Sequence, residues 1–303
     1  MTIIKTVADL DQAIKDVAAT FDIPVARVRT TFIGVVTSQM LPNSVELKGG
    51  LAIKMRLGEL GTRATSDLDA VYTSDYKKTI EEIKYLCKIG WGQVPPSKRQ
   101  LRANPGAPNR VAFTGAIKEK PQHDPGVDRP EYLMRPLRVS LQFLGKQWGA
   151  IDLELAHPEV MANSGTQAPI DTELKMQFES FGFGKITSVR FLSVELQIAQ
   201  KVHALTHPNS DRAHDLVDLQ KLWTAEVDTS ILLEACESTF RYRRDHSWPP
   251  LPLRPMAADR ERYLQAVQEV STNGQDPDVR PDLDDAREWL ENRINTLLNH
   301  EEI

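Results

Sequence analysis

The stretch that decides the fold runs from Leu47 to Tyr72 and reads LKGGLAIKMRLGELGTRATSDLDAVY. It places two carboxylates, Asp67 and Asp69, one residue apart in a run of alternating apolar and β-branched residues. Such a run is typical of a β-strand, in which residues two apart project from the same face. We therefore expect the two aspartates side by side, with Leu68 pointing into the core.

Two carboxylates held this close repel each other, and their ionised state is costly unless a cation lies between them. Hard oxygen ligands suit Mg²⁺ or Mn²⁺, which favour a few carboxylates together with substrate phosphates. The alternative is a pair of solvated aspartates at a strand end, and an isolated Asp-x-Asp pattern more often means that. The flanking sequence has to decide between the two.

Three upstream features favour a phosphate ligand. Gly49-Gly50 lies between a predicted strand, VELK (45–48), and a predicted helix, LAIKMRLGEL (51–60). Backbone N–H groups at such a turn can approach a phosphate closely, although a glycine pair is more often just a turn. Arg63 and Thr65 alternate with the two aspartates, so a strand that starts early places a cation and a hydroxyl on their face. That combination suits a triphosphate with its metal.

A third carboxylate is expected from the run WGAIDLELA (148–156), where apolar residues alternate with Asp152 and Glu154. The alternation predicts a strand that buries the apolar residues and leaves both acids on its other face. If this strand lies next to that of Asp67 and Asp69, Asp152 completes a two-metal cluster.

The hydrophobic period changes once along the chain. Before Ser193 it predicts a mixed order of helices and strands, and after it a helical pattern prevails. The predicted helices cover 7–21, 25–41, 73–90, 193–205, 211–223, 238–244 and 283–298, and the predicted strands cover 45–48, 67–73, 110–120, 137–145 and 148–156. We expect an α/β (α+β) domain with a mixed sheet at 1–190 and a mostly α-helical domain at 191–303.

Length, apolar content and cysteine spacing indicate how many domains the chain forms and which kinds of protein it can be. A chain of 303 residues with 41% hydrophobic residues can bury the cores of two domains. No window approaches the ~20 apolar residues of a membrane span, and the N-terminus lacks the build of a secretory signal, so we expect a cytoplasmic protein without a membrane partner. Cys87 and Cys236 have no ligand-type spacing and are expected as core thiols rather than a disulfide or a zinc site.

The net charge of −5 is unevenly distributed. Residues 273–303 hold nine acidic residues and three arginines, a net charge of −6, which leaves +1 for the rest of the chain. Within that rest, FRYRRDHSWPPLPLRP (240–255) interleaves arginines with aromatic residues, a pattern that can bind nucleic acid. A Pro-rich linker after a helix is an equally good interpretation.

The helical half contains a candidate cation and a candidate carboxylate. Lys201 flanks the apolar stripe of its helix, so its stem can pack while its ammonium reaches a cleft. Asp215 and Asp218 border the stripe of the next helix. A Lys-Asp bridge that ties the two helices together is the simpler reading of these residues alone. Arg212 can bind a phosphate, or merely lie in the first turn of its helix.

The order LKGG, helix, RxTxDLD and later strand ID resembles the nucleotidyltransferase superfamily, and most closely the AbiEii-type nucleotidyltransferase toxins of abortive-infection and toxin-antitoxin systems. SVELQIAQKVHAL and RAHDLVDLQKLW look like the lysine motif and the later aspartate motif of that family, so the resemblance covers residues 45–223. Two departures are Leu51, where a hydroxyl residue often follows the glycine pair, and His214, where a basic residue often precedes the motif's aspartate.

The resemblance implies a metal-dependent nucleotidyltransferase that transfers an NMP from an NTP to RNA, with the tRNA 3′ end as the leading acceptor, pyrophosphate as product and growth inhibition as result. A co-encoded antitoxin is also implied. The expected site residues are the metal ligands Asp67, Asp69 and Asp152, the catalytic residues Lys201 and Asp215, and the phosphate-binding residues Gly49, Gly50, Arg63, Thr65, Lys201 and Arg212.

Two other functions stay open at this point. The same fold can modify a protein or a small molecule, as other nucleotidyltransferases do. A non-catalytic nucleotide- or RNA-binding module, with carboxylates that hold no metal, is the alternative from a different class. The sequence does not indicate the preferred nucleotide, the oligomeric state, whether an antitoxin binds directly, or the role of the acidic C-terminal segment.

Overall fold

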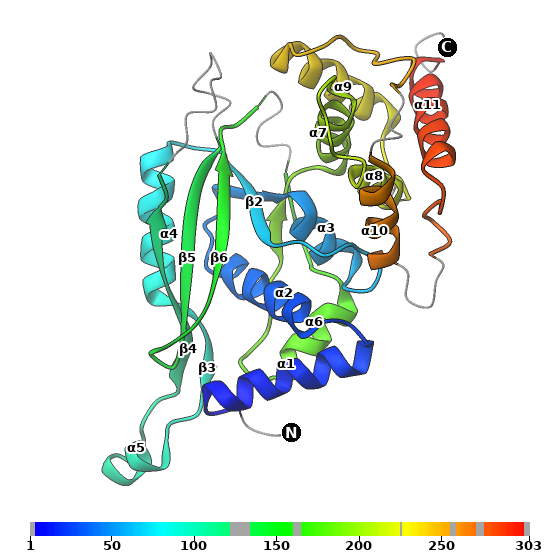
Figure 1. The fold of residues 1–303 in the computed structure, drawn as a ribbon. Coiled ribbons are helices and arrows are strands. Elements are labelled where there is room, and N and C mark those ends of the chain that lie inside the picture. Colours follow the sequence, from blue (N-terminus) through cyan, green and yellow to red (C-terminus); the bar gives the residue numbers. More distant parts are fainter. Residues whose placement is uncertain are drawn as a thin grey trace. The chain divides into compact units, whose positions relative to one another are not determined.

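The computed structural model describes residues 4–121, 134–159, 165–224, 226–254, 259–270 and 276–299. Part of the acidic terminal segment, including Glu301 and Glu302, lies outside the described residues. In chain order the elements are α1 (Val7–Phe21), α2 (Val25–Ser38), β1 (Val45–Lys48), α3 (Gly49–Leu57), β2 (Asp67–Tyr72), α4 (Tyr76–Ile89), β3 (Trp91–Val94), α5 (Lys98–Ala103), β4 (Arg110–Glu119), β5 (Arg135–Phe143), β6 (Lys146–Ala156), β7 (Thr166–Ala168), α6 (Thr172–Glu179), β8 (Val189–Phe191), α7 (Val194–Thr206), α8 (Asp215–Leu222), α9 (Thr229–Arg243), α10 (Arg260–Val270) and α11 (Leu283–Asn299) (Figure 1).

The chain forms two compact units. The first unit contains residues 1–59, 65–157 and 167–191, and the second contains 60–64, 158–166 and 192–303. Each unit has its own interior. Two short segments that precede residue 190 in the sequence, 60–64 and 158–166, therefore belong to the same unit as the C-terminal helices. The change in hydrophobic period at Ser193 does not reveal this.

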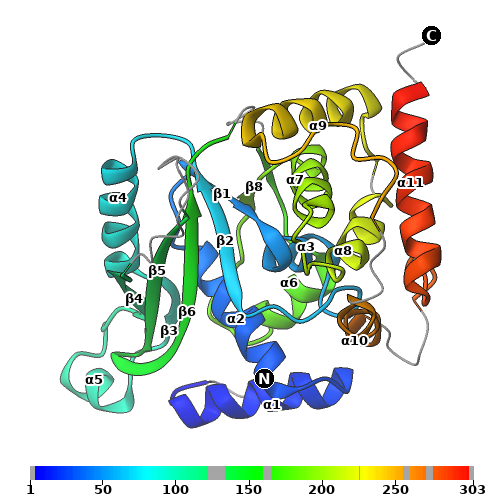
Figure 2. The same cartoon turned by 45° about the horizontal axis from the view of Figure 1, so that its top comes forward.

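An eight-stranded mixed sheet organises the first unit, in the order β3-β4-β5-β6-β2-β1-β8-β7. The meander from β3 to β6 is antiparallel, whereas β6 pairs with β2 in parallel and β2 pairs with β1 antiparallel. A mixed sheet was expected from the sequence, and the structure confirms it. The parallel pair β2 and β6 brings two segments far apart in the sequence side by side (Figure 2).

One face of this sheet is covered by helices. Phe32 of α2 lies 5.8 Å, between ring centroids, from both Phe113 of β4 and Trp148 of β6. Cys87 of α4 packs closely against Gly115 of β4 on the same face, where an added Cβ would lie 3.3 Å from Cys87 Cβ. Because strand side chains alternate, the polar residues of the central strands project from the opposite face. That opposite face carries the candidate site.

Several short elements were not predicted. These are β3, α5, β7, α6, β8 and α10, most of which are too short to show a hydrophobic period. The helix expected to stop at Gly61 ends at Leu57, where Gly58 with φ 91° supplies a backbone conformation that other residues avoid. α2 ends at Ser38 instead of reaching Leu41.

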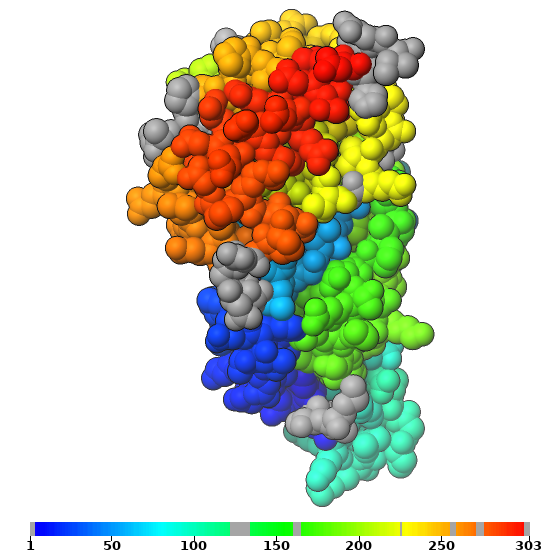
Figure 3. Space-filling model, turned by 90° about the vertical axis from the view of Figure 1, so that its right-hand side faces the viewer, coloured from blue at the N-terminus to red at the C-terminus, as the bar shows by residue number. Residues whose placement is uncertain are grey.

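The second unit is helical, and its core comes from the apolar stripes of α7 to α11. Ile198 of α7, Leu219 of α8 and Leu290 of α11 are completely buried. Cys236 on α9 is buried and unpaired, as is Cys87 in the first unit, which confirms both as core thiols. α11 has one side at the surface (Figure 3). No helix in the described ranges has the length and apolar character that crossing a bilayer demands.

Three residues of the Arg-rich and aromatic segment at 240–255 make internal contacts of the second unit. Phe240 is buried, Arg243 donates to Glu159 at 2.7 Å, and Arg254 forms an ion pair with Asp259. These three residues therefore fit the structural interpretation of the segment better than the nucleic-acid one.

His203 lies in the interface between α7 and α9, with 2% of its surface exposed. Its ring centroid is 4.8 Å from that of Phe240, and its Nδ1 lies 3.4 Å from Arg243 Nη1. Burial, together with the charge of Arg243, lowers the pKa of His203 to about 3. The His203 side chain is therefore uncharged in the folded protein near pH 7.

This burial predicts a pH-dependent stability. Between the ordinary pKa of 6.5 and the lowered value, unfolded His203 binds a proton and folded His203 does not. Stability therefore falls as pH falls through this window, by up to ~1.4 kcal/mol per pH unit. We expect wild-type protein to lose about 1.6 kcal/mol more than a His203→Gln variant between pH 6.5 and 5, measured by urea unfolding. Equal losses in the two proteins would contradict this account of His203.

Candidate active site

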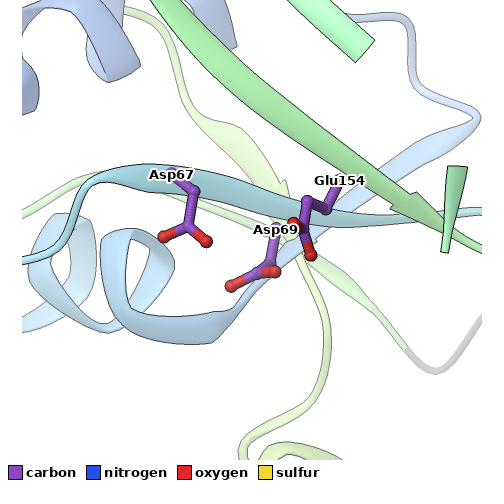
Figure 4. A group of neighbouring side chains, drawn as sticks. All are labelled: Asp67, Asp69 and Glu154. Carbon is purple, nitrogen blue, oxygen red and sulfur yellow. The ribbon is translucent and has the colours of Figure 1, made fainter. Parts of the chain in front are cut away.

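Three carboxylates converge on the face of the central strands that lies opposite their buried leucines. Asp67 and Asp69 project from β2 and Glu154 from β6, all toward the same side (Figure 4). One oxygen from each residue lies within 4.8 Å of the others. All three side chains are partly buried. We refer to these three residues as the carboxylate cluster.

The register between β2 and β6 creates this cluster. Leu68 pairs with Leu153, both completely buried, so their neighbours on each strand must face the other way. Asp69 is thereby placed opposite Glu154, its Cα partner on β6. The buried leucines thus position the charged residues, at a point where repulsion alone would separate them.

The third carboxylate of the cluster is Glu154. Asp152, the residue expected there from the sequence, is not among the three, and its role as a metal ligand stays a prediction. Asp152 does pair with Asp67 across the same two strands. Its oxygens, however, accept hydrogen bonds from Arg138 Nη1 at 2.8 Å and lie 2.9 Å from Lys120 Nζ. Partial burial raises the pKa of Asp152, but these two cations outweigh it and lower the pKa.

Glu154 shows the opposite electrostatic behaviour. Burial raises its pKa, and the negative charges of Asp69, Asp67 and Asp152 raise it further. A cation that binds beside a carboxyl group under such repulsion stabilises the ionised form of that group. Three oxygen donors of this kind are the ligand set preferred by Mg²⁺ and Mn²⁺, so the residues fit a divalent metal.

Gly49 makes room for Asp69. It has φ +72°, and a Cβ added there would lie 1.9 Å from Asp69 Oδ2, far inside van der Waals contact. Both the backbone conformation and the close approach therefore require glycine at this position. Leu51, the departure from the family pattern, packs on Gly34 of α2 and is completely buried. A leucine there contributes to the core.

Arg63 and Thr65 do not share a strand with the aspartates, because β2 begins at Asp67. Thr65 still reaches the cluster, since its Oγ1 donates to Asp67 Oδ1 at 3.2 Å. Arg63 belongs to the second unit, where its Nε and Nη2 lie 3.0 Å from Asp218 Oδ2. The condition on which the four residues would share one face, an early start of the strand, is therefore not met.

A buried ion network occupies the first turns of α8 in the second unit. Lys201 donates to Asp215 Oδ1 and to Asp218 Oδ2, both at 2.7 Å. Arg212 Nε donates to the other oxygen of Asp215 at 2.6 Å. This is the bridge between helices that the simpler reading anticipated, with Arg63 as an additional cation.

Asp215 is completely buried, and burial alone raises its pKa, but the charges of Lys201 and Arg212 outweigh burial and lower the pKa. Burial lowers the pKa of His214, which precedes it. His214 is therefore mainly neutral near pH 7 and adds little charge to the network. Asp218 was not selected from the sequence, although its spacing of three residues from Asp215 on one helix face was visible.

Residues 41–292 match the family model described as nucleotidyl transferase AbiEii toxin, type IV toxin-antitoxin system. Among solved structures, the chain is similar to MenT4, a nucleotidyltransferase toxin from Mycobacterium tuberculosis H37Rv, with a TM-score of 0.52 and 16% identity over 97% of this chain and 90% of that one. It is also similar to JHP933 from Helicobacter pylori, with a TM-score of 0.44 and 13% identity over 90% and 91% of the two chains. No curated protein matches the chain.

The contact between Gly49 and Asp69 predicts that Gly49→Ala disrupts the carboxylate cluster. A Cβ at this position displaces the Asp69 carboxylate, so we expect Mn²⁺ affinity, measured by calorimetry, to fall about tenfold or more. Gly145→Ala is the matched control, because Gly145 has φ +80° and no atom within 4 Å of an added Cβ. Equal Mn²⁺ affinities in the two variants would contradict the role assigned to Gly49.

The buried network predicts that Lys201→Met destabilises the protein. The variant leaves two buried carboxylates without their shared cation, which costs about 3–5 kcal/mol. Lys84→Met, which breaks an exposed pair with Glu81, is expected to cost less than about 1 kcal/mol. Urea unfolding of the two variants measures both values, and a loss below 1 kcal/mol for Lys201→Met would show that the network does not stabilise the fold.

Proposed function

The chain belongs to the AbiEii family of nucleotidyltransferase toxins of type IV toxin-antitoxin systems, and we propose that it transfers an NMP from an NTP to the 3′ end of tRNA, using the carboxylate cluster and a divalent metal. Family membership makes the chain a nucleotidyltransferase enzyme with an NTP substrate and a co-encoded antitoxin. The RNA acceptor, the metal, growth inhibition and a cytoplasmic location belong to the proposal.

The convergence of Asp67, Asp69 and Glu154 within 4.8 Å is the observation that supports this function best. These residues would hold Mg²⁺ or Mn²⁺, with Glu154 in the role first expected of Asp152. A divalent cation bound there offsets the charge of the triphosphate and favours ionisation of the acceptor hydroxyl.

In the proposed reaction, the ribose hydroxyl oxygen of the acceptor attacks the α-phosphorus of the NTP. The bond from that phosphorus to the bridging oxygen of the β-phosphate breaks, and pyrophosphate leaves. The hydroxyl proton passes to an oxygen of the Glu154 carboxylate and then to water. Thr65 orients Asp67 by its hydrogen bond throughout.

The remaining residues keep their predicted roles as hypotheses. Gly49 and Gly50 at the start of α3 offer backbone N–H groups to phosphates. Arg63, Lys201 and Arg212 are cations suited to the charge of a triphosphate, with Asp215 holding Lys201 in place.

A labelling experiment tests the proposed function. Purified protein is incubated with each α-labelled NTP, Mg²⁺ and total tRNA, and the products are separated into RNA and protein. We expect label on RNA. Label on protein alone would support the alternative acceptor, and no label in either fraction would contradict the proposal.

Substitutions in the cluster sharpen this test. Asp69→Asn and Glu154→Gln each remove a charged ligand at nearly constant shape, so we expect transfer rates to fall at least about a thousandfold. Glu81→Gln on α4 is the matched control and is expected to keep the wild-type rate, because its side chain is 71% exposed and pairs only with Lys84 among the described residues. Wild-type labelling by either cluster variant would remove the basis of the proposal.

A further inference from the structure

A row of basic side chains lies beside the carboxylates on the same face of the sheet. Lys118 of β4 pairs with Arg138 of β5, and Arg138 pairs with Asp152 of β6. Asp152 in turn pairs with Asp67 of β2. Because paired residues project from the same face of a sheet, these four side chains cross neighbouring strands on the face that bears the carboxylate cluster.

A third cation joins this row. Lys120 follows β4, where its N–H donates to the Pro136 carbonyl oxygen at 2.9 Å, and its Nζ lies 2.9 Å from Asp152. We call Lys118, Lys120 and Arg138 the basic platform. Within the described part of the chain, Asp152 is the carboxylate with which the platform forms ion pairs. The platform with Asp152 therefore carries a surplus of two positive charges.

Stability does not explain the platform. The side chains of Lys120 and Arg138 remain 43% and 46% exposed while they pair with Asp152. Ion pairs this exposed contribute only about 0–1 kcal/mol to folding. Lys118 is also exposed and forms no ion pair among the described residues. Exposed cations that do little for the fold are available to a ligand.

Only small side chains project from the sheet at the positions next to the basic platform. Ala116, Ser140 and Ala150 pair across β4, β5 and β6 on the same face, two residues along each strand from Lys118, Arg138 and Asp152. Small side chains there leave the backbone of a large ligand free to approach. Arg138 lies two strands from Asp67, which corresponds to about 10 Å at the usual strand spacing.

We propose that the basic platform binds the phosphodiester backbone of the acceptor RNA, so that the phosphates preceding its 3′ end lie over β4 and β5 while the terminal hydroxyl reaches the carboxylate cluster. This inference rests on the proposed function, because it takes the cluster as the place of transfer. Asp152 has the role of holding Lys120 and Arg138 in position over the sheet. Lysine and arginine bind such a backbone through charge and hydrogen bonds without reading its sequence.

The test compares tRNA binding and NMP transfer in three proteins. The platform variant is Lys118→Gln, Lys120→Gln and Arg138→Gln combined, and its rescue variant is Lys118→Arg, Lys120→Arg and Arg138→Lys combined. The control variant removes three exposed charges from α4, as Lys77→Gln, Lys84→Gln and Lys88→Gln. Total tRNA is the probe, binding is followed by fluorescence anisotropy at 50 and 200 mM salt, and transfer gives separate KM values for tRNA and NTP.

Each phosphate contact contributes about 0.7 to the slope of log affinity against log salt for a single strand, so three contacts contribute about 2. Wild-type affinity should therefore fall about 20-fold further than that of the platform variant between the two salt concentrations. We expect the platform variant to raise the KM for tRNA about tenfold or more with the KM for NTP unchanged, and the rescue and control variants to behave as wild type.

Unchanged tRNA affinity and salt slope in the platform variant would overturn the inference, and so would a raised KM for NTP alone, which would assign these cations to the triphosphate. If wild-type protein transfers label to RNA in the same way as the platform variant, this inference fails while the proposed function stands. If tRNA binding depends on the platform but no label is transferred, the proposed function fails while the platform remains an RNA-binding surface.

Discussion

The repulsion among three carboxylates on one face of a parallel strand pair is the constraint on which the site depends. Leu68 and Leu153 are paired and completely buried, so hydrophobic burial forces Asp67, Asp69 and Glu154 out on the other face. Burial of each leucine side chain stabilises the fold by roughly 1.5–3 kcal/mol. This free energy opposes the repulsion that would otherwise move the carboxylates apart. The core thus keeps the three carboxylates close together, and a bound cation reduces the repulsion among them.

The buried carboxylates of the two units have different electrostatic surroundings. In the second unit, Asp215 and Asp218 are neutralised by Lys201, Arg63 and Arg212, and the pKa of Asp215 is lowered in spite of complete burial. In the first unit, the pKa of Glu154 is raised by its own neighbours. A network in which cations contact carboxylates stabilises a fold, whereas a group of carboxylates that raise the pKa of one of their number favours a ligand of opposite charge. The carboxylate cluster is of the second kind.

The sequence revealed the outline of this site but could not provide its register. Period-two alternation was sufficient to predict that Asp67 and Asp69 share a face, and that β6 carries acids. A β-bulge between Leu141 and Gln142 shifts the pairing of β5 with β6 by one residue and thereby brings Arg138 opposite Asp152. The register between β2 and β6, which pairs Asp69 with Glu154, is likewise not visible in the sequence of either strand, so the alternation predicted acids on β6 without indicating which of them joins the cluster. Arg63 was misplaced because nothing in RATSDLD marks where β2 begins.

A crystal structure of the protein with Mn²⁺ and a non-hydrolysable NTP analogue, with Mn²⁺ identified by its anomalous scattering, tests the central claim most directly. The account predicts an anomalous peak bound by oxygens of Asp67, Asp69 and Glu154, next to the triphosphate, while Asp152 keeps its contacts with Lys120 and Arg138. A peak bound by Asp152 without Glu154, or a triphosphate bound with no metal at the three carboxylates, would contradict it.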